Sequence, residues 1–124
     1  MSKLGEFYQS GDFKNEKHVP VIELPSEIKS GEKFTISVSV GKDIAHPNTI
    51  EHHIAWIQVY FVADGAKFPI EIGKFDFDGH GDGALTEPEV SFSFKTDKNG
   101  KIIASSYCNL HGLWESEENL SVKE

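Results

Sequence analysis

The stretch Lys33-Phe34-Thr35-Ile36-Ser37-Val38-Ser39-Val40 decides the fold class of this chain. From Phe34 onward it alternates strictly, with Phe34, Ile36, Val38 and Val40 on one face and small hydroxyl side chains on the other. A period of two residues is typical of a β-strand with one buried face. We therefore predict a half-buried strand here and search outward from it for its partners.

Further strand signals occur along most of the chain, and no stretch shows the period of an amphipathic helix. The run His53–Val62 is rich in Ile, Val and aromatic residues and predicts a central strand buried on both faces. Gly73 is a candidate β-bulge, and Asp97–Gly100 contains an Asn-Gly pair that predicts a tight hairpin turn. The other strands are expected at 19–24, 68–77, 90–94 and 101–107, with a last short strand at Leu120 and Val122. About seven short antiparallel strands predict an all-β, immunoglobulin-like sandwich, with the Gly-rich stretch 78–88 as its least ordered part.

Length and composition exclude several classes of protein. The 124 residues fit one domain, spanning 1–124. A single Cys cannot form an intrachain disulfide, and a net charge of −8 argues against nucleic acid and anionic membranes as partners. No apolar run is long enough to span a bilayer, and the first residues lack the features of a signal peptide. We therefore expect a cytoplasmic protein.

Counting strand directions brings the metal-ligating residue types together. If each connection reverses the chain, the segment before the first strand, the loop 41–52 and the residues after 107 all lie at one end of the sandwich. Five potential ligands then converge there: His18, His46, His52, Cys108 and His111. Their joint position favours a metal site.

Each segment alone has a simpler interpretation. Cys108 and His111 form a Cys-x-x-His pair, but a lone Cys is more often a small buried hydrophobe. The loop with His46, His52 and His53 could be merely solvated, and His52 and His53 should point to opposite faces because they are adjacent. A non-catalytic β-sandwich binding module with incidental His residues is therefore one alternative.

The donor set limits the choice of metal. Four imidazoles with one thiolate fit a structural zinc site poorly, since such sites close at four ligands and usually contain more sulfur. Imidazole and thiolate together suit iron or copper. A blue-copper electron-transfer protein is the second alternative, but its axial ligand is usually Met and the only Met is Met1. Iron with five protein ligands would leave one position open for a small molecule.

Three motifs occur in order along the chain: Glu16-Lys17-His18-Val19-Pro20, the segment 46–53 (HPNTIEHH) and the segment 106–115 (SYCNLHGLWE). Together they resemble superoxide reductase of the neelaredoxin type, over nearly the whole chain. This family has an immunoglobulin-like sandwich fold, which agrees with the strand count. The resemblance implies an oxidoreductase that reduces superoxide by one electron to hydrogen peroxide at a mononuclear non-haem iron.

The resemblance also implies roles for individual residues. The equatorial iron ligands would be His18, His46, His52 and His111, and Cys108 would be the axial ligand. Glu16 resembles the carboxylate that occupies the open position in the ferric state, and Lys17 resembles an exposed lysine beside it, which makes both candidate catalytic residues. His53 and His80 match no ligand of the family.

Cofactor and partners follow from the same resemblance: one iron per chain, superoxide as substrate, rubredoxin or a similar small protein as electron donor, and a homo-oligomer, commonly a tetramer. The net charge of −8 does not prevent an anionic substrate from binding. Exposed charges are largely screened beyond about 8 Å, whereas one ammonium about 6 Å from an anion contributes roughly 3 kcal/mol at an effective dielectric near 20. Lys17 is the candidate for this local attraction, with Lys14 and Lys42 as possible helpers.

Overall fold

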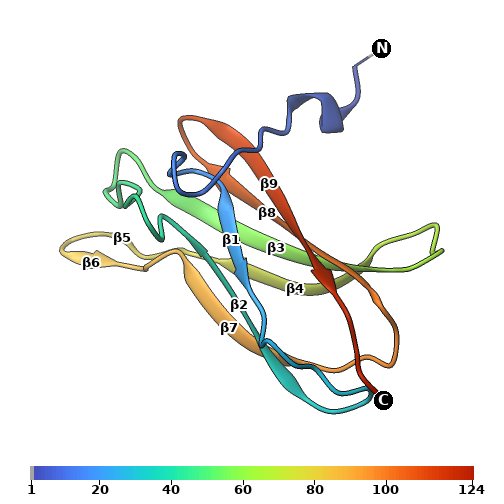
Figure 1. Cartoon of the computed structure of the whole chain (residues 1–124). Helices are drawn as coiled ribbons and strands as arrows, with labels where there is room; N and C mark the ends of the chain where they lie inside the picture. Colours follow the sequence, from blue (N-terminus) through green and yellow to red (C-terminus); the bar gives the residue numbers. More distant parts are fainter. Residues whose placement is uncertain (1) are drawn as a thin grey trace.

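The computed structural model describes residues 2–124, and its strands form two antiparallel sheets that face each other (Figure 1). This confirms the predicted all-β sandwich. The smaller sheet has the strand order β1-β2-β7 and the larger has the order β4-β3-β8-β9. The bounds are β1 Pro20–Glu23, β2 Phe34–Val40, β3 Ile54–Ala63, β4 Ile70–Asp76, β7 Glu89–Phe94, β8 Gly100–Cys108 and β9 Gly112–Leu120.

The hydrophobic core lies between the two sheets. In β2, Ile36, Val38 and Val40 are buried and the residues between them are not, as the alternating pattern predicts. They face the buried side chains of Ile57 and Val59 from β3, together with further aliphatic residues of β8. Burial of this alternating apolar face stabilises the sandwich, at roughly 25 cal/mol for each Å² of apolar surface removed from water.

β3 is the central strand of the larger sheet, pairing with β4 on one side and β8 on the other. Its outward face is half-buried rather than buried, so the prediction of burial on both faces is correct only for the core side. The predicted irregularity near Gly73 is present, because Val59 pairs with Gly73 and Tyr60 with Glu71, which leaves Ile72 as the extra residue.

Two details of the predicted topology are wrong. Asp97–Gly100 is not a hairpin turn, because β7 belongs to the smaller sheet and β8 to the larger, so the turn carries the chain from one sheet to the other. The last strand is not a short one at Leu120 and Val122 but the nine-residue β9. The sequence hides β9 because it is an edge strand rich in exposed glutamates, with only Trp114 and Leu120 buried.

The Gly-rich stretch contains a small hairpin of its own, β5 (His80–Gly81) with β6 (Ala84–Leu85). Asp82 and Gly83 both have positive φ, 57° and 80°, as a two-residue type I′ turn requires. The Asp-Gly pair was therefore an available signal for this hairpin. A single 3₁₀ turn, η1 (Leu4–Phe7), is the only helical segment within residues 2–124.

The strand register brings the ends of four strands to one end of the sandwich. Pro20 at the start of β1 pairs with Val40 at the end of β2, and Ile54 at the start of β3 pairs with Cys108 at the end of β8. The loops that precede β1, connect β2 to β3 and connect β8 to β9 therefore meet at this end, as Figure 1 shows. In the part of the chain that the structure describes, no helix is long and apolar enough to cross a membrane.

Candidate metal centre

Four side chains from these loops and from the end of β8 form a compact cluster: His18, His46, His52 and Cys108. One potential ligand atom from each lies within 4.8 Å of the others. His18, His46 and Cys108 are buried and His52 is half-buried. The imidazole rings pack edge to face, with centroids 4.8 Å apart for His18 and His46 and 4.7 Å apart for His46 and His52. The strand directions inferred from the sequence thus correctly predicted that these four residues lie at the same end of the sandwich.

The His46 ring has a defined tautomer. Its Nδ1 lies 2.7 Å from the carbonyl oxygen of Pro47. A carbonyl oxygen only accepts hydrogen bonds, so Nδ1 carries the proton and Nε2 carries the lone pair. Nε2 of His46 is buried without a hydrogen-bond partner, as is Nε2 of His52. Buried polar atoms normally have a hydrogen-bond partner, so two buried imidazole nitrogens without one, within a single cluster, point to a metal cation as the missing partner.

His18 is held by the carboxylate of Glu16. Oε1 of Glu16 accepts hydrogen bonds from Nδ1 of His18 at 2.6 Å and from its backbone N–H at 2.9 Å. Desolvation acts to raise the pKa of Glu16, but the hydrogen bonds from His18 and the attraction between the two groups outweigh it and lower the pKa. An ionised Glu16 keeps the proton of His18 on Nδ1 and leaves the lone pair on Nε2, as carboxylate partners of metal-binding imidazoles do.

His111 adjoins the cluster through its Nδ1 atom. This atom lies 3.1 Å from Nε2 of His18 and 3.7 Å from Sγ of Cys108. The carbonyl of His111 accepts hydrogen bonds from Nε2 of Gln9 at 3.0 Å and from Nε1 of Trp114 at 3.2 Å, and these fix the turn that presents the ring. Five nitrogen and sulfur donors therefore meet at this end of the sandwich.

Burial and nearby cationic groups favour the neutral form of two imidazoles of the cluster, His46 and His52. Desolvation lowers the pKa of His46 to about 4 despite its hydrogen bond to Pro47, and charges at His18, His52 and Lys17 contribute in the same direction. The pKa of His52 is also lowered, first by desolvation and then by charges that include His111, His18 and Lys17. Neutral imidazoles are the form that ligates a metal. Lys17 contributes to the lowered pKa of both rings, after desolvation and the neighbouring imidazoles.

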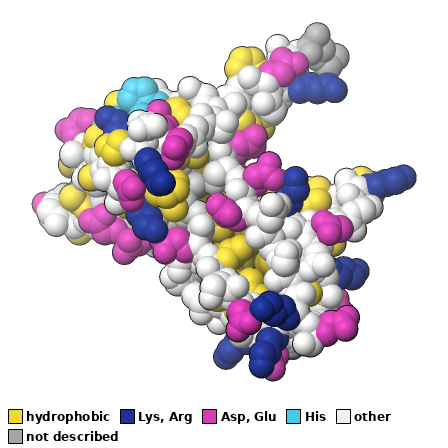
Figure 2. Space-filling model, viewed as in Figure 1, with side chains coloured by type: hydrophobic (Ala, Val, Ile, Leu, Met, Phe, Trp, Pro, Cys, Tyr) yellow, Lys and Arg dark blue, Asp and Glu magenta, His cyan; other side chains and the backbone are white. Residues whose placement is uncertain are grey.

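The surroundings of Lys17 and Lys42 differ. Lys17 is half-buried. The ammonium of Lys42 forms an ion pair with Glu23 at 3.0 Å and lies 6.0 Å from the ring centroid of Phe13. Figure 2 shows a histidine side chain exposed at the end of the molecule that carries the cluster, with a basic side chain beside it. Lys17 is thus the better placed of the two to attract an anion.

The two remaining His residues form a separate pair. His53 and His80 stack with centroids 3.7 Å apart and an interplanar angle of 13°. Nδ1 of His53 donates to the carbonyl of Thr49 at 2.9 Å, and the stack joins the β5–β6 hairpin to the loop before β3. Neither residue belongs to the four-residue cluster.

Sequence reasoning gave no role to Trp114, which supports the cluster directly. Its indole stacks on His18 with centroids 4.9 Å apart and an interplanar angle of 13°. Trp114 lies within the third motif, three residues after His111, and a large aromatic residue so close to a proposed ligand was the signal available.

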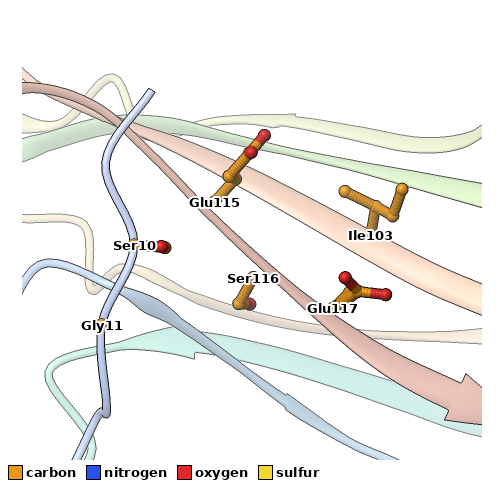
Figure 3. A pocket seen from close by; sticks show the side chains of 6 residues that line it. All are labelled: Ser10, Gly11, Ile103, Glu115, Ser116 and Glu117. Carbon is orange, nitrogen blue, oxygen red and sulfur yellow. The ribbon is translucent and has the colours of Figure 1, made fainter. Parts of the chain in front are cut away.

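A surface pocket of about 460 Å³, lined by none of the cluster residues, lies between the N-terminal segment and strands β8 and β9 (Figure 3). Its lining contains two carboxylates and no His or Cys among the described residues: Ser10, Gly11, Ile103, Glu115, Ser116 and Glu117. Carboxylates repel a small anion, so this pocket does not compete with the cluster as a site for one.

The fold and the cluster define a small β-sandwich protein with a His/Cys metal centre, and the comparisons with known proteins agree. The profile of the desulfoferrodoxin family matches residues 10–117. The superoxide reductase of Pyrococcus horikoshii is 56% identical over 117 residues, which are 94% of this chain and 98% of that protein. The neelaredoxin of Megalodesulfovibrio gigas is 44% identical over 129 residues, 98% of this chain and 99% of that one.

A solved structure matches equally well over most of both chains. The superoxide reductase (neelaredoxin) from Archaeoglobus fulgidus, in its reduced form, superimposes with a TM-score of 0.86 at 48% identity and covers 94% of this chain and 99% of that one. The chain therefore belongs to the desulfoferrodoxin family, among its superoxide reductases and neelaredoxins.

Proposed function

We propose that this protein is a superoxide reductase. One superoxide anion takes up one electron from an external donor and two protons from solvent, and one molecule of hydrogen peroxide is formed without release of O₂. The observation that carries the proposal is the convergence of His18, His46, His52 and Cys108 within 4.8 Å, in a chain of this family.

We assign one iron ion per chain to this cluster. The proposed ligands are His18, His46, His52, His111 and Cys108, and Glu16 is proposed as a further ligand of the oxidised metal. The donor set supports the assignment, because imidazoles with a single thiolate suit iron and the buried Nε2 atoms of His46 and His52 have no other partner. When bound, the iron would supply the one-electron redox change and a position for the substrate.

The protein's own residues then have distinct tasks. Lys17 attracts superoxide, since it directly precedes His18 and its charge, after desolvation and the neighbouring imidazoles, helps to lower the pKa of both His46 and His52. Glu16 keeps His18 in the tautomer and orientation that present Nε2, through the hydrogen bond at 2.6 Å. Trp114 covers one face of His18 and restricts its rotation.

The electron donor must approach the cluster from outside. His111 is exposed and His52 is half-buried, so their rings lie close to the surface and shorten the path for an electron. We propose rubredoxin or a similar small iron protein as the donor. The exposure of His111 supports docking at this end of the sandwich.

The remaining parts of the proposal concern the whole chain. We propose that residues 1–124 act as a single iron-binding domain, that the protein works in the cytoplasm, and that it assembles into a homotetramer. Exposed apolar side chains such as Leu4 (64%), Phe7 (61%) and Phe68 (78%) support self-association, because burying them would remove apolar surface from water.

The test combines metal analysis with reaction stoichiometry. Protein purified without oxygen should contain one iron per chain, and its oxidised form should show the EPR signal of high-spin ferric ion. Under a known flux of superoxide, one electron should be consumed per superoxide without O₂ release. Release of one O₂ for every two superoxide ions would identify a dismutase instead, and a cupric EPR signal would identify a blue-copper protein.

Cys108→Ser provides the matched variant. It keeps the size of the side chain and replaces the thiolate with a hydroxyl, which is a much poorer ligand for iron. We expect loss of the sulfur-to-iron absorption band. An unchanged visible spectrum would remove Cys108 from the proposed site.

A further inference from the structure

The side chain of Asn109 joins two of the loops that carry the cluster. Its Oδ1 accepts a hydrogen bond from the backbone N–H of His53 at 2.9 Å, and its Nδ2 donates to the carbonyl of Glu51 at 3.0 Å. Asn109 directly follows Cys108 in the turn between β8 and β9, whereas Glu51 and His53 lie 58 and 56 residues away in the sequence. One amide group therefore spans the gap between the two loops.

These two hydrogen bonds bracket His52. The carbonyl of Glu51 belongs to the peptide bond before His52, and the N–H of His53 belongs to the peptide bond after it. Fixing both peptide planes fixes the direction of the Cα–Cβ bond of His52, and with it the reach of the imidazole. We propose that Asn109 is a positioning residue, which sets the His52 ring relative to the Cys108 sulfur. The proposal rests on the metal site described under the proposed function.

Within residues 2–124, no other side-chain hydrogen bond to the backbone around His52 links this loop to the β8–β9 turn. Thr49 also binds His52, since its Oγ1 accepts from the backbone N–H of His52 at 3.0 Å and its own backbone N–H donates to the carbonyl of His52 at 2.9 Å. These bonds span three residues, so they define the local shape of the loop without attaching it to the β8–β9 turn. The attachment is made by Asn109.

The chemistry requires an amide at this position. Asn offers one acceptor and two donors on a short side chain, so it can satisfy a carbonyl and an N–H at once. An ionised Asp keeps the bond to the N–H of His53 but places a negative oxygen against the carbonyl of Glu51. Ala removes both bonds. The backbone bond from the N–H of Asn109 to the carbonyl of His53, 3.2 Å, remains available in each variant.

Asn99 provides a control of the same residue type. Its Oδ1 accepts a hydrogen bond from the backbone N–H of Val122 at 2.8 Å, near the start of β8. That contact lies at the other end of β8 from Cys108. Asn99→Ala should therefore reduce stability through a lost side-chain-to-backbone bond without any effect on the cluster.

The experiment measures Co²⁺ binding to metal-free protein, followed by the sulfur-to-cobalt and d–d absorption bands. We expect Asn109→Ala to bind Co²⁺ on the order of 10-fold more weakly and with shifted d–d bands, since supporting residues of metal sites typically contribute 10- to 100-fold in affinity. Asn109→Asp should fall between Ala and the unmodified protein. Asn99→Ala should lower the thermal midpoint but keep the affinity and spectrum unchanged.

Two results would overturn the proposal: unmodified affinity and spectrum in Asn109→Ala, or the same loss in Asn99→Ala. The measurement is independent of turnover. If the unmodified protein binds Co²⁺ through the cluster but its iron form leaves superoxide unreduced, the proposed function fails and the role of Asn109 is still decided by the titration.

Discussion

The carboxylate of Glu16 binds His18 twice, through Nδ1 of the ring at 2.6 Å and through the backbone N–H at 2.9 Å, and the same oxygen atom accepts both bonds. This contact gives Glu16 a task even when it does not bind a metal. The resemblance by sequence points instead to a carboxylate at the open metal position. Both roles are compatible only if the carboxylate moves between His18 and the metal.

Variants of Glu16 test this exchange. Glu16→Ala should change the visible spectrum of the oxidised iron form and weaken iron retention on the order of 10-fold, because His18 loses its partner. Turnover by the reduced, iron-loaded form should be spared. Glu115→Ala, an exposed carboxylate on β9, serves as the control for the change in net charge. An identical spectrum in Glu16→Ala would exclude the carboxylate from the metal.

Lys17 is the second residue to test. Lys17→Ala should slow superoxide capture on the order of 10-fold at low salt, because local charge focuses an anionic substrate and raises its rate of association. The difference should shrink as salt is added and charges are screened. Iron content should stay at the level of the unmodified protein.

The control for Lys17 is Lys98→Ala, which removes the same charge from the turn that precedes β8. Rate constants measured by rapid mixing over a range of ionic strength would separate the two. Equal rates for Lys17→Ala and the unmodified protein at low salt would contradict the assigned role.

The fold could be predicted wherever the core imposes a period on the sequence. In β2 the buried and exposed faces alternate as the residues do, so one stretch defined the strand and its inner face. β9 could not be recognised because few of its residues are buried and several of the exposed ones are glutamates, so its sequence lacks an alternating apolar face. It forms a strand because its backbone pairs with β8 along its whole length. The prediction of a hairpin turn at Asp97–Gly100 was wrong for a related reason. A local turn signal does not say in which sheet the next strand will pair.

The site was predictable at the level of chain segments and not of side-chain contacts. Strand direction alone placed His18, His46, His52 and Cys108 at one end, where the structure has them. The hydrogen bond between Glu16 and His18 depends on side-chain rotamers and on the turn between them, which no residue pattern encodes. The two hydrogen bonds of the Asn109 side chain, to His53 and Glu51, join residues more than fifty positions apart, and the sequence shows only that Asn109 follows Cys108.

Trp114 offers a test of packing at the cluster. Its ring stacks on His18 and its Nε1 donates to the carbonyl of His111 at 3.2 Å. Trp114→Ala should lower the free energy of unfolding by about 3–5 kcal/mol, as removal of a buried aromatic side chain does. Trp114→Phe retains an aromatic face and loses the donor, so it should cost less. Chemical denaturation of the metal-free forms measures both, and equal losses would show that the indole N–H rather than the stacking dominates.

Gly41 controls the start of the loop that carries His46. It has a φ of 92°, and a Cβ added to it would lie 2.6 Å from the backbone N of His46 and 3.3 Å from its Cβ. Gly41→Ala should therefore destabilise the fold and displace His46. Gly65 is the matched control, since its φ is 80° and a Cβ there would meet nothing within 4 Å.

The two Ala variants share the strain of a left-handed backbone, which costs roughly 1–2 kcal/mol for a residue with a Cβ. Only Gly41→Ala adds the clash with His46. We expect Gly65→Ala to lose stability alone, and Gly41→Ala to lose more stability and also Co²⁺ affinity. Thermal melts and Co²⁺ titrations of the metal-free proteins measure the two effects separately. If both variants bound Co²⁺ as tightly as the unmodified protein, the close approach of Gly41 to His46 would have no part in forming the site.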